Sequence, residues 1–224
     1  YKLPDCDDDT LVFYSIFEWT ERKNPVALLR AYLEEFAEHD NVVLLVKTYV
    51  DNFNNEQAKF IRTQFKAIRG RYGASGAKMF LYRHLMDRSQ INRLHETGDC
   101  YVTAHRGEGW GIPIVEAMLH GNPVITTGYN GVHDYLDSSV AYLLPYTMVG
   151  VQNNRNQRWY SSDQKWANVD LRALRSAMRR VYNNKIEARE MGGRAREFVL
   201  NRFNFHTVGK MLAERLSAIE RDLS

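Results

Sequence analysis

The chain has 224 residues, 44% of them hydrophobic, so it can bury a sizeable core as one large domain or two small ones. Its formal net charge is +3, with 30 basic residues interleaved with 27 acidic ones, which argues against nucleic acid as the main partner. No apolar run approaches the roughly 20 residues that cross a bilayer, and the two cysteines match neither a metal site nor a disulfide framework, which favours a reducing cytoplasm.

Short apolar segments alternate with amphipathic helical patterns along the first two thirds of the chain. The predicted strands are 11–17, 42–46, 78–82, 100–104, 123–127 and 139–143, and the predicted helices are 25–36, 58–70, 87–97, 113–120 and 132–136. This alternation indicates βαβ units and a parallel sheet with helices on both faces, which is a Rossmann-like α/β fold. Ligands of such sheets collect beyond the carboxyl ends of the strands.

The remaining segments have a different character. Residues 1–10 contain Asp7-Asp8-Asp9 and are expected to be a disordered lead-in to a domain spanning 11–203. Residues 146–167 form a long polar connection, which is typical of a functional or mobile segment. Apolar residues at helical spacing then predict helices over 171–181 and 208–219. Because the chain begins at Tyr1 without a signal-like segment, we expect it to be part of a longer protein.

The most informative stretch follows the strand predicted at 100–104. It reads Arg106-Gly107-Glu108-Gly109-Trp110-Gly111-Ile112-Pro113-Ile114-Val115-Glu116. Glycines let backbone N–H groups approach a ligand closely, and a helix N-terminus offers unpaired donors to an anion. Glutamates accept hydrogen bonds from hydroxyl groups. A ligand that carries both phosphates and sugar hydroxyls is a nucleotide sugar.

At these residues the chain resembles the C-terminal half of a retaining, family 4 type glycosyltransferase with the GT-B fold. That family carries two glutamates separated by seven residues around a glycine-rich turn, here Glu108 and Glu116. Further matches are Ala104-His105-Arg106-Gly107, Gly121-Asn122-Pro123-Val124, the basic loop Glu21-Arg22-Lys23-Asn24-Pro25, and Ala188-Arg189-Glu190-Met191-Gly192. The similarity runs from about Leu11 to the last helix.

The resemblance implies roles for the two glutamates. Glu116 would hydrogen-bond the ribose hydroxyls of the donor, although a carboxylate early in a helix is also favoured by the helix dipole alone. Glu108 would contact the donor sugar as the catalytic candidate, although a charged residue between glycines is often a solvated loop residue. A competing interpretation is that the two glutamates are the acid and the nucleophile of a glycosidase. The glycine-rich turn at a helix start, which suits a phosphate, disfavours it.

The resemblance also implies a diphosphate site. Lys23 would pair with the diphosphate, but the arginine that the family often has six residues earlier is Phe17 here, and Arg22 is the candidate replacement. Backbone amides of Gly109, Trp110, Gly111 and Ile112 would bind the donor, with the Trp110 ring packed on the domain rather than on a sugar.

Three further residues are candidates for the donor site. Lys47, at a strand end, is expected to reach the crevice or to extend into water. His105 is expected to line the site or to tie the loop down. Arg83, after the third strand, is expected near the base or the phosphates. The arginines at 172, 175, 179 and 180 indicate a solvated helix face, with an anionic membrane surface as the alternative.

The function that this resemblance implies is transfer of a hexosyl unit from a nucleoside diphosphate sugar to a hydroxyl, with retention of the anomer. No cofactor and no metal are expected, because no Asp-x-Asp triplet lies near the site. The acceptor, a glycan, lipid or protein, would bind an N-terminal domain absent from this chain, toward which the helix at 204–224 would pack. The enzyme would be cytoplasmic or at the cytoplasmic membrane face. Alternatives are another GT-B-like enzyme, such as an epimerase or phosphorylase, and a non-catalytic binding module.

Overall fold

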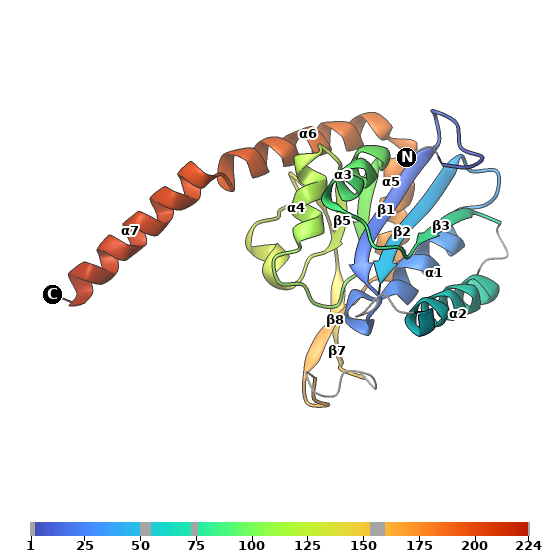
Figure 1. The fold of residues 1–224 in the computed structure, drawn as a ribbon, viewed down its shortest axis with the longest axis horizontal. Helices are drawn as coiled ribbons and strands as arrows, with labels where there is room; N and C mark the ends of the chain where they lie inside the picture. The colour runs from blue at the N-terminus through green and yellow to red at the C-terminus, as the bar shows by residue number, and fades with distance from the viewer. Residues whose placement is uncertain (1–2, 50–54, 73–75, 153–159, 224) are drawn as a thin grey trace.

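The computed structural model describes residues 3–49, 55–72, 76–152 and 160–223 (Figure 1). Within them lies a parallel sheet of six strands in the order β3-β2-β1-β4-β5-β6. The strands are β1 (Leu11–Glu18), β2 (Val42–Tyr49), β3 (Lys78–Tyr82), β4 (Cys100–Thr103), β5 (Val124–Thr127) and β6 (Tyr142–Leu144). The predicted Rossmann-like α/β fold is therefore confirmed.

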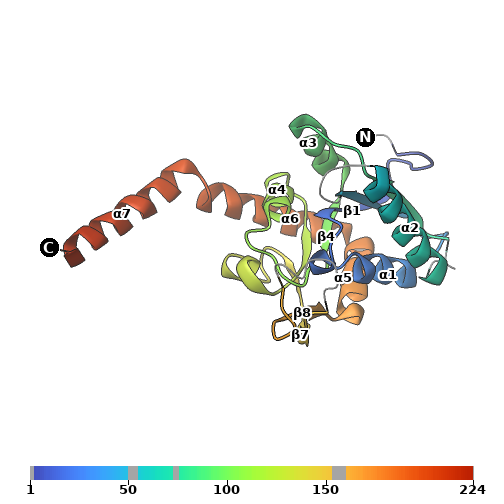
Figure 2. The same cartoon turned by 60° about the horizontal axis from the view of Figure 1, so that its bottom comes forward.

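Helices cover both faces of this sheet (Figures 1 and 2). They are α1 (Pro25–Glu35), α2 (Asn55–Tyr72), α3 (Arg88–Thr97), α4 (Ile112–Leu119), α5 (Leu171–Asn183), α6 (Lys185–Arg202) and α7 (Phe205–Leu223), with two short 3-10 helices, η1 (Glu21–Lys23) and η2 (Asn130–Asp134). Helices α1, α2 and α5 share one buried cluster, and α3 and α4 share the other. Helix α6 contributes to both clusters, so it runs from one layer to the other.

Strand β1 shows why the sheet is buried on both sides. Phe13 and Phe17 point into the cluster of α1, α2 and α5, whereas Val12 and Tyr14 point into the cluster of α3 and α4. Successive side chains of a strand face opposite sides, so a strand covered by helices on both faces needs apolar residues at nearly every position. This is the continuous apolar pattern that the sequence shows.

Specific residues start the helices. Asn24 has a left-handed backbone (φ 52°), and its side-chain oxygen accepts a hydrogen bond from the Ala27 amide at 3.4 Å. Pro25 follows as the first residue of α1, where it loses no hydrogen bond. Helix α3 begins with a capping box between Asp87 and Gln90.

The stretch 146–167, predicted to be an irregular connection, contains an antiparallel hairpin. Strands β7 (Tyr146–Gly150) and β8 (Lys165–Val169) pair with each other, while residues 153–159 lie outside the described part. Most β7 side chains are exposed, so no apolar alternation marks the strand in the sequence. The last sheet strand begins at Tyr142 rather than at 139, because residues 137–140 form a turn.

The arginines of α5 are not simply a solvated face. Arg175 lies 3.1 Å from a Glu35 carboxylate oxygen, and Arg179 lies 2.8 Å from an oxygen of Asp40. Arg180 pairs with Glu187 at the start of α6. Three of the four residues therefore hold α5 against α1 and α6, which corrects the expectation of a wholly hydrated basic patch.

The two ends of the chain behave differently. Leu3 is buried, and the Asp7 carboxylate accepts hydrogen bonds from the side chains of Thr10 (2.7 Å) and Asn41 (2.9 Å). These contacts of residues 3–10 differ from the disordered lead-in expected there. At the other end, α7 extends away from the body of the domain (Figures 1 and 2), and it has no buried residue. None of the described helices combines the length and the hydropathy of a membrane span.

Candidate functional site

The candidate site lies at the carboxyl ends of β1 and β4, which are neighbours in the sheet. Strand order reverses between these two strands, and that is where open α/β sheets bind ligands. The loops that follow them are joined directly: the Arg106 amide donates to the Arg22 carbonyl, and Arg22 Nη1 donates to the Gly107 carbonyl, both at 2.7 Å. The fold thus brings together the two loops that the sequence singled out.

Lys23 and Glu108 meet at this junction although 85 residues separate them. The Lys23 ammonium forms an ion pair with the Glu108 carboxylate, and Arg22 Nη1 lies 3.9 Å from the other carboxylate oxygen. Burial lowers the pKa of Lys23, and the Glu108 charge opposes this shift in part. The site therefore holds two cations around a single carboxylate, next to the glycine-rich turn.

The glycine-rich turn is fixed from both sides. Gly111 adopts a left-handed conformation (φ +72°) immediately before α4, which favours glycine. The Gly131 amide in η2 donates to the Glu108 carbonyl at 3.1 Å. A Cβ atom on Gly131 would lie 1.9 Å from the Gly109 carbonyl oxygen, so only glycine permits this approach. At the start of α4, Pro113 has no N–H and the Ile114 amide donates to the Gly111 carbonyl at 2.8 Å, so the Ile112 amide is the candidate donor to an anion there.

Trp110 anchors the turn to the domain, as the sequence indicated. Its ring centroid lies 4.8 Å from that of Tyr135 and 4.8 Å from that of Phe203. The Tyr135 hydroxyl donates to the Trp110 carbonyl at 2.6 Å. Trp110 is still 48% exposed, and Ile112 is 62% exposed at the first turn of α4. The four residues that were expected to offer backbone amides, 109–112, thus lie on a turn held by the aromatic packing of Trp110.

Glu116 projects from α4 toward α3. Its carboxylate pairs with Arg88, and its other oxygen lies 3.4 Å from His95 Nε2. Burial alone would raise the pKa of Glu116, but the contacts from His95 and Arg88 outweigh burial, so its pKa lies below the ordinary value. Glu116 is therefore a charged acceptor at neutral pH.

A buried polar chain lies behind Glu116, and the sequence analysis did not find it. His95 Nδ1 lies 2.9 Å from the Tyr14 hydroxyl. The Asn122 side-chain amide donates to that hydroxyl at 2.8 Å and to the His95 carbonyl at 2.7 Å. These residues come from β1, α3 and the loop before β5, so no local motif could have linked them.

His105 is entirely buried beneath the site. Its Nε2 lies 3.1 Å from the Thr126 hydroxyl in β5. Burial lowers the pKa of His105 to about 4, the nearby Glu108 opposing this shift in part, so the imidazole is neutral at physiological pH. Of its two expected roles, tying the loop to the sheet fits these contacts.

Two other expected residues, Lys47 and Arg83, contact Tyr49 and α2 respectively. Lys47 is 3% exposed in β2, with its ammonium 5.6 Å from the centroid of the Tyr49 ring, and burial lowers its pKa. Arg83 Nη1 donates to the Ala58 carbonyl in α2 at 3.0 Å. Arg83 thus contacts α2, and its place near the base or phosphates stays a prediction.

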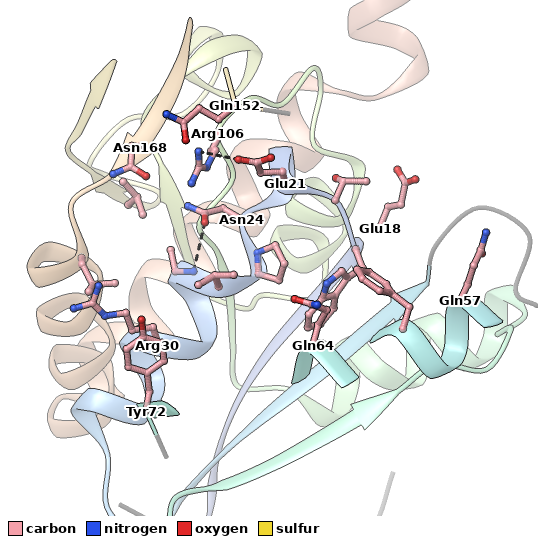
Figure 3. A pocket seen from close by; sticks show the side chains of 18 of the residues that line it. Glu18, Glu21, Asn24, Arg30, Gln57, Gln64, Tyr72, Arg106, Gln152 and Asn168 are labelled. Atoms are coloured by element: carbon pink, nitrogen blue, oxygen red, sulfur yellow. Dashed lines mark hydrogen bonds and ion pairs between the residues drawn. The ribbon is translucent and has the colours of Figure 1, made fainter. Parts of the chain in front are cut away.

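Two cavities adjoin the junction of the loops. The smaller, of about 690 Å³, is lined by Arg22, Glu108 and Gly109 of the predicted site together with η2 and the hairpin. The larger, of about 880 Å³, lies beside η1 and the start of α1 (Figure 3). Arg106 lines both. No group of three or more His, Cys, Asp or Glu side chains among the described residues is placed to hold a metal ion.

Comparison with known families agrees with this architecture. Residues 5–163, more than half of the chain, match the family model of the glycosyl transferases group 1. The chain belongs to this family. No curated protein matches its sequence directly.

Solved glycosyltransferases share the fold. HepE from Anabaena, whose structure holds UDP and glucose, superposes with a TM-score of 0.65 at 16% identity, over 94% of this chain and 49% of HepE. Sucrose-phosphate synthase from Thermosynechococcus elongatus superposes with a TM-score of 0.68 at 18% sequence identity, and the match covers 96% of this chain and 46% of the synthase. The C-terminal domain of LpcC, a glycosyl transferase group 1 family protein from Francisella tularensis, superposes with a TM-score of 0.60 at 14% sequence identity, and the match covers 87% of each chain. This chain spans about half the length of HepE and of the synthase.

Proposed function

We propose that this domain binds the nucleoside diphosphate sugar donor of a retaining glycosyltransferase, which transfers a hexosyl unit to a hydroxyl of an acceptor. Membership in the glycosyl transferases group 1 supports the reaction class. The fold match to HepE, whose structures hold UDP, UDP and glucose, or UDP-glucose, supports a uridine nucleotide as the first ligand to test.

The observation that carries this proposal is the meeting of Lys23 with Glu108 at the start of the turn into α4. In the donor complex, Lys23 and the amides of residues 109–112 bind the diphosphate, and Glu108 turns to the sugar ring. Glu116 accepts hydrogen bonds from the ribose hydroxyls. The ion pair between Lys23 and Glu108 holds both side chains in place until the donor enters.

The same groups stabilise the leaving diphosphate. Negative charge grows on the diphosphate as its bond to the anomeric carbon breaks. Lys23, Arg22 and the amides of residues 109–112 are fixed before the reaction, so little reorganisation is needed to stabilise that charge. Because these groups supply the positive charge, the proposed mechanism needs no metal ion.

The whole enzyme includes a second domain in this proposal. Helix α7 exposes an apolar face made of Phe205, Val208, Met211, Leu212, Leu216, Ile219 and Leu223. We assign this face to contact with the N-terminal domain that binds the acceptor, whether a glycan, a lipid or a protein. The enzyme acts in a reducing compartment, in keeping with the free thiols of Cys6 and Cys100.

Calorimetry with UDP and UDP-glucose tests donor binding by this chain. Saturable binding that Lys23→Ala and Glu116→Gln both weaken supports the proposal, and failure to bind any nucleoside diphosphate would favour a module without catalytic function. For the complete protein, NMR analysis of the product identifies the type of reaction. A new glycosidic bond with the donor's anomeric configuration is expected, whereas an epimerised nucleotide sugar or a sugar phosphate would identify a different enzyme.

A further inference from the structure

The larger cavity, of about 880 Å³, has a lining unlike that of the candidate donor site (Figure 3). It lies between the turn after β1, the start of α1, helix α2 and strand β8. Five side-chain amides line it: Asn24, Gln57, Gln64, Gln152 and Asn168. Three aromatic residues line it as well: Trp19, Phe60 and Tyr72.

The charges of this cavity disfavour a phosphate group. Its two arginines already have acidic partners, since Arg30 Nε lies 2.6 Å from Glu34 and Arg106 Nη1 lies 3.7 Å from Glu21. Two further carboxylates, Glu18 and Glu56, also line the wall. A nucleoside diphosphate would bring its negative charges toward a wall with more acidic than basic groups. The ligand that fits is neutral.

Amides and aromatic rings together suit a sugar. Each side-chain amide offers two N–H donors and a carbonyl acceptor, which match hydroxyl groups that both donate and accept. Pyranose rings also carry apolar C–H faces, which pack against aromatic side chains. The volume is within the range of cavities that hold small ligands.

Asn24 gives independent support for a polar ligand. It is only 4% exposed, and its side-chain oxygen accepts a hydrogen bond from the Ala27 amide. Its Nδ2 atom and the Arg106 Nε atom are buried at this cavity without a hydrogen-bond partner in the described part of the chain. Buried donors left unpaired cost about 1–3 kcal/mol each, and a hydroxyl-bearing ligand relieves that cost once the two side chains turn toward it. In Figure 3 the amide of Asn24 lies among Arg106, Gln152 and Asn168.

We propose that this cavity binds a neutral pyranose residue. Arg106 lines this cavity and also the cavity of Glu108, so a sugar bound here lies next to the donor. This inference rests on the proposed function: the cavity holds a sugar of the acceptor. The acceptor is therefore a neutral glycan or glycoconjugate. Part of acceptor recognition then belongs to this domain.

Saturation-transfer NMR on the 224-residue chain tests this with methyl α-glucopyranoside, methyl α-mannopyranoside and methyl α-galactopyranoside as probes, with and without UDP. Val26→Trp puts a large ring at a cavity position that is 46% exposed, where the fold should tolerate it. Asn168→Ala removes one lining amide. Arg62→Ala, on the exposed side of α2 and away from the cavity, is the matched control.

We expect saturable binding of at least one glycoside that persists in the presence of UDP. Val26→Trp should abolish it and Asn168→Ala should raise its Kd about tenfold, which corresponds to about 1.4 kcal/mol, while UDP affinity and the Arg62→Ala control stay unchanged. Binding that both cavity variants leave intact, or UDP binding without any glycoside binding, overturns the inference. Loss of UDP affinity in Val26→Trp would make this the nucleotide site instead. Glycoside binding without UDP binding would support the sugar site and refute the proposed donor site.

Discussion

His95 Nε2 lies 3.4 Å from a carboxylate oxygen of Glu116, the residue proposed to hold the donor ribose. The opposite ring nitrogen of His95 contacts the Tyr14 hydroxyl at 2.9 Å, and Asn122 donates to that hydroxyl in turn. A buried chain of this kind fixes the orientation of its last member, because no solvent competes for the contacts. His95 is therefore a positioning residue for Glu116.

Replacing Glu116 should remove recognition of ribose. We expect Glu116→Gln to weaken UDP binding by about 1.5–3 kcal/mol, the contribution of hydrogen bonds to a charged group. Calorimetry with 2′,3′-dideoxyuridine diphosphate is the control, since that ligand lacks both hydroxyls and should bind the two proteins alike. Equal losses for both ligands would show that Glu116 does not contact the ribose.

The supporting role of His95 has its own test. His95→Gln should retain a donor toward Glu116 and keep most of the preference for UDP over the dideoxy ligand, whereas His95→Ala should reduce that preference about tenfold, or about 1.4 kcal/mol. Urea unfolding of both variants is the control for folding, and the two midpoints should be comparable. A preference that is unchanged in His95→Ala would remove the positioning role.

Lys23 is expected to supply the main cation for the diphosphate. Lys23→Ala should weaken UDP binding by about 1.5–3 kcal/mol, because a charge-assisted hydrogen bond is lost. The matched variant is Lys66→Ala, an exposed lysine of α2, which should leave the affinity unchanged. Uridine, which has no phosphate, should bind the Lys23 variant and the unaltered chain equally. A Lys23 variant with unaltered UDP affinity would discard this role.

The core of the fold was predictable from the sequence because packing and pattern agree there. Strand β1 is apolar on both faces, and Asn24 with Pro25 starts α1 as their chemistry dictates. That the loops carrying Lys23 and Glu108 share one edge of the sheet also followed from its parallel strands, whereas the ion pair between the two side chains did not. These features depend on short stretches of chain, each with one dominant physical preference.

Features built from several distant segments were not predictable in this way. The large cavity is lined by residues of α1, α2 and β8, which no local pattern brings together. Hairpin β7–β8 lacks the apolar alternation that would mark a strand, because residues such as Tyr146 and Met148 remain exposed. At Phe17, where the family resemblance leads us to expect an arginine, the side chain is buried against Trp19, and Arg22 lies beside Glu108.

His105 should make stability depend on pH. Its pKa in the folded chain is about 4, below the value of 6.5 for an unperturbed histidine, so the unfolded chain binds the proton more readily. The stability that this group contributes is complete above about pH 6.5 and declines as pH falls toward 4, by up to about 3 kcal/mol. Urea unfolding measured at several pH values between about 4 and 6.5 checks this decline in stability. His105→Asn should flatten the pH dependence, and an equally steep decline in that variant would contradict the assignment.

Two adjacent glycines of α6 allow a matched test of how the site is supported. A Cβ atom on Gly192 would lie 2.0 Å from the carbonyl oxygen of Gly121, which follows α4, whereas nothing lies within 4 Å of one on Gly193. Gly192→Ala must push α4 away from α6 and should cost about 1–3 kcal/mol of unfolding free energy, as overpacking does. Gly193→Ala should stabilise by about 0.5–1 kcal/mol through helix propensity. Because α4 carries Glu116 and the amides of the turn, Gly192→Ala should also weaken UDP binding. Similar stability in the two variants would mean that α4 and α6 do not meet as closely as this backbone contact requires.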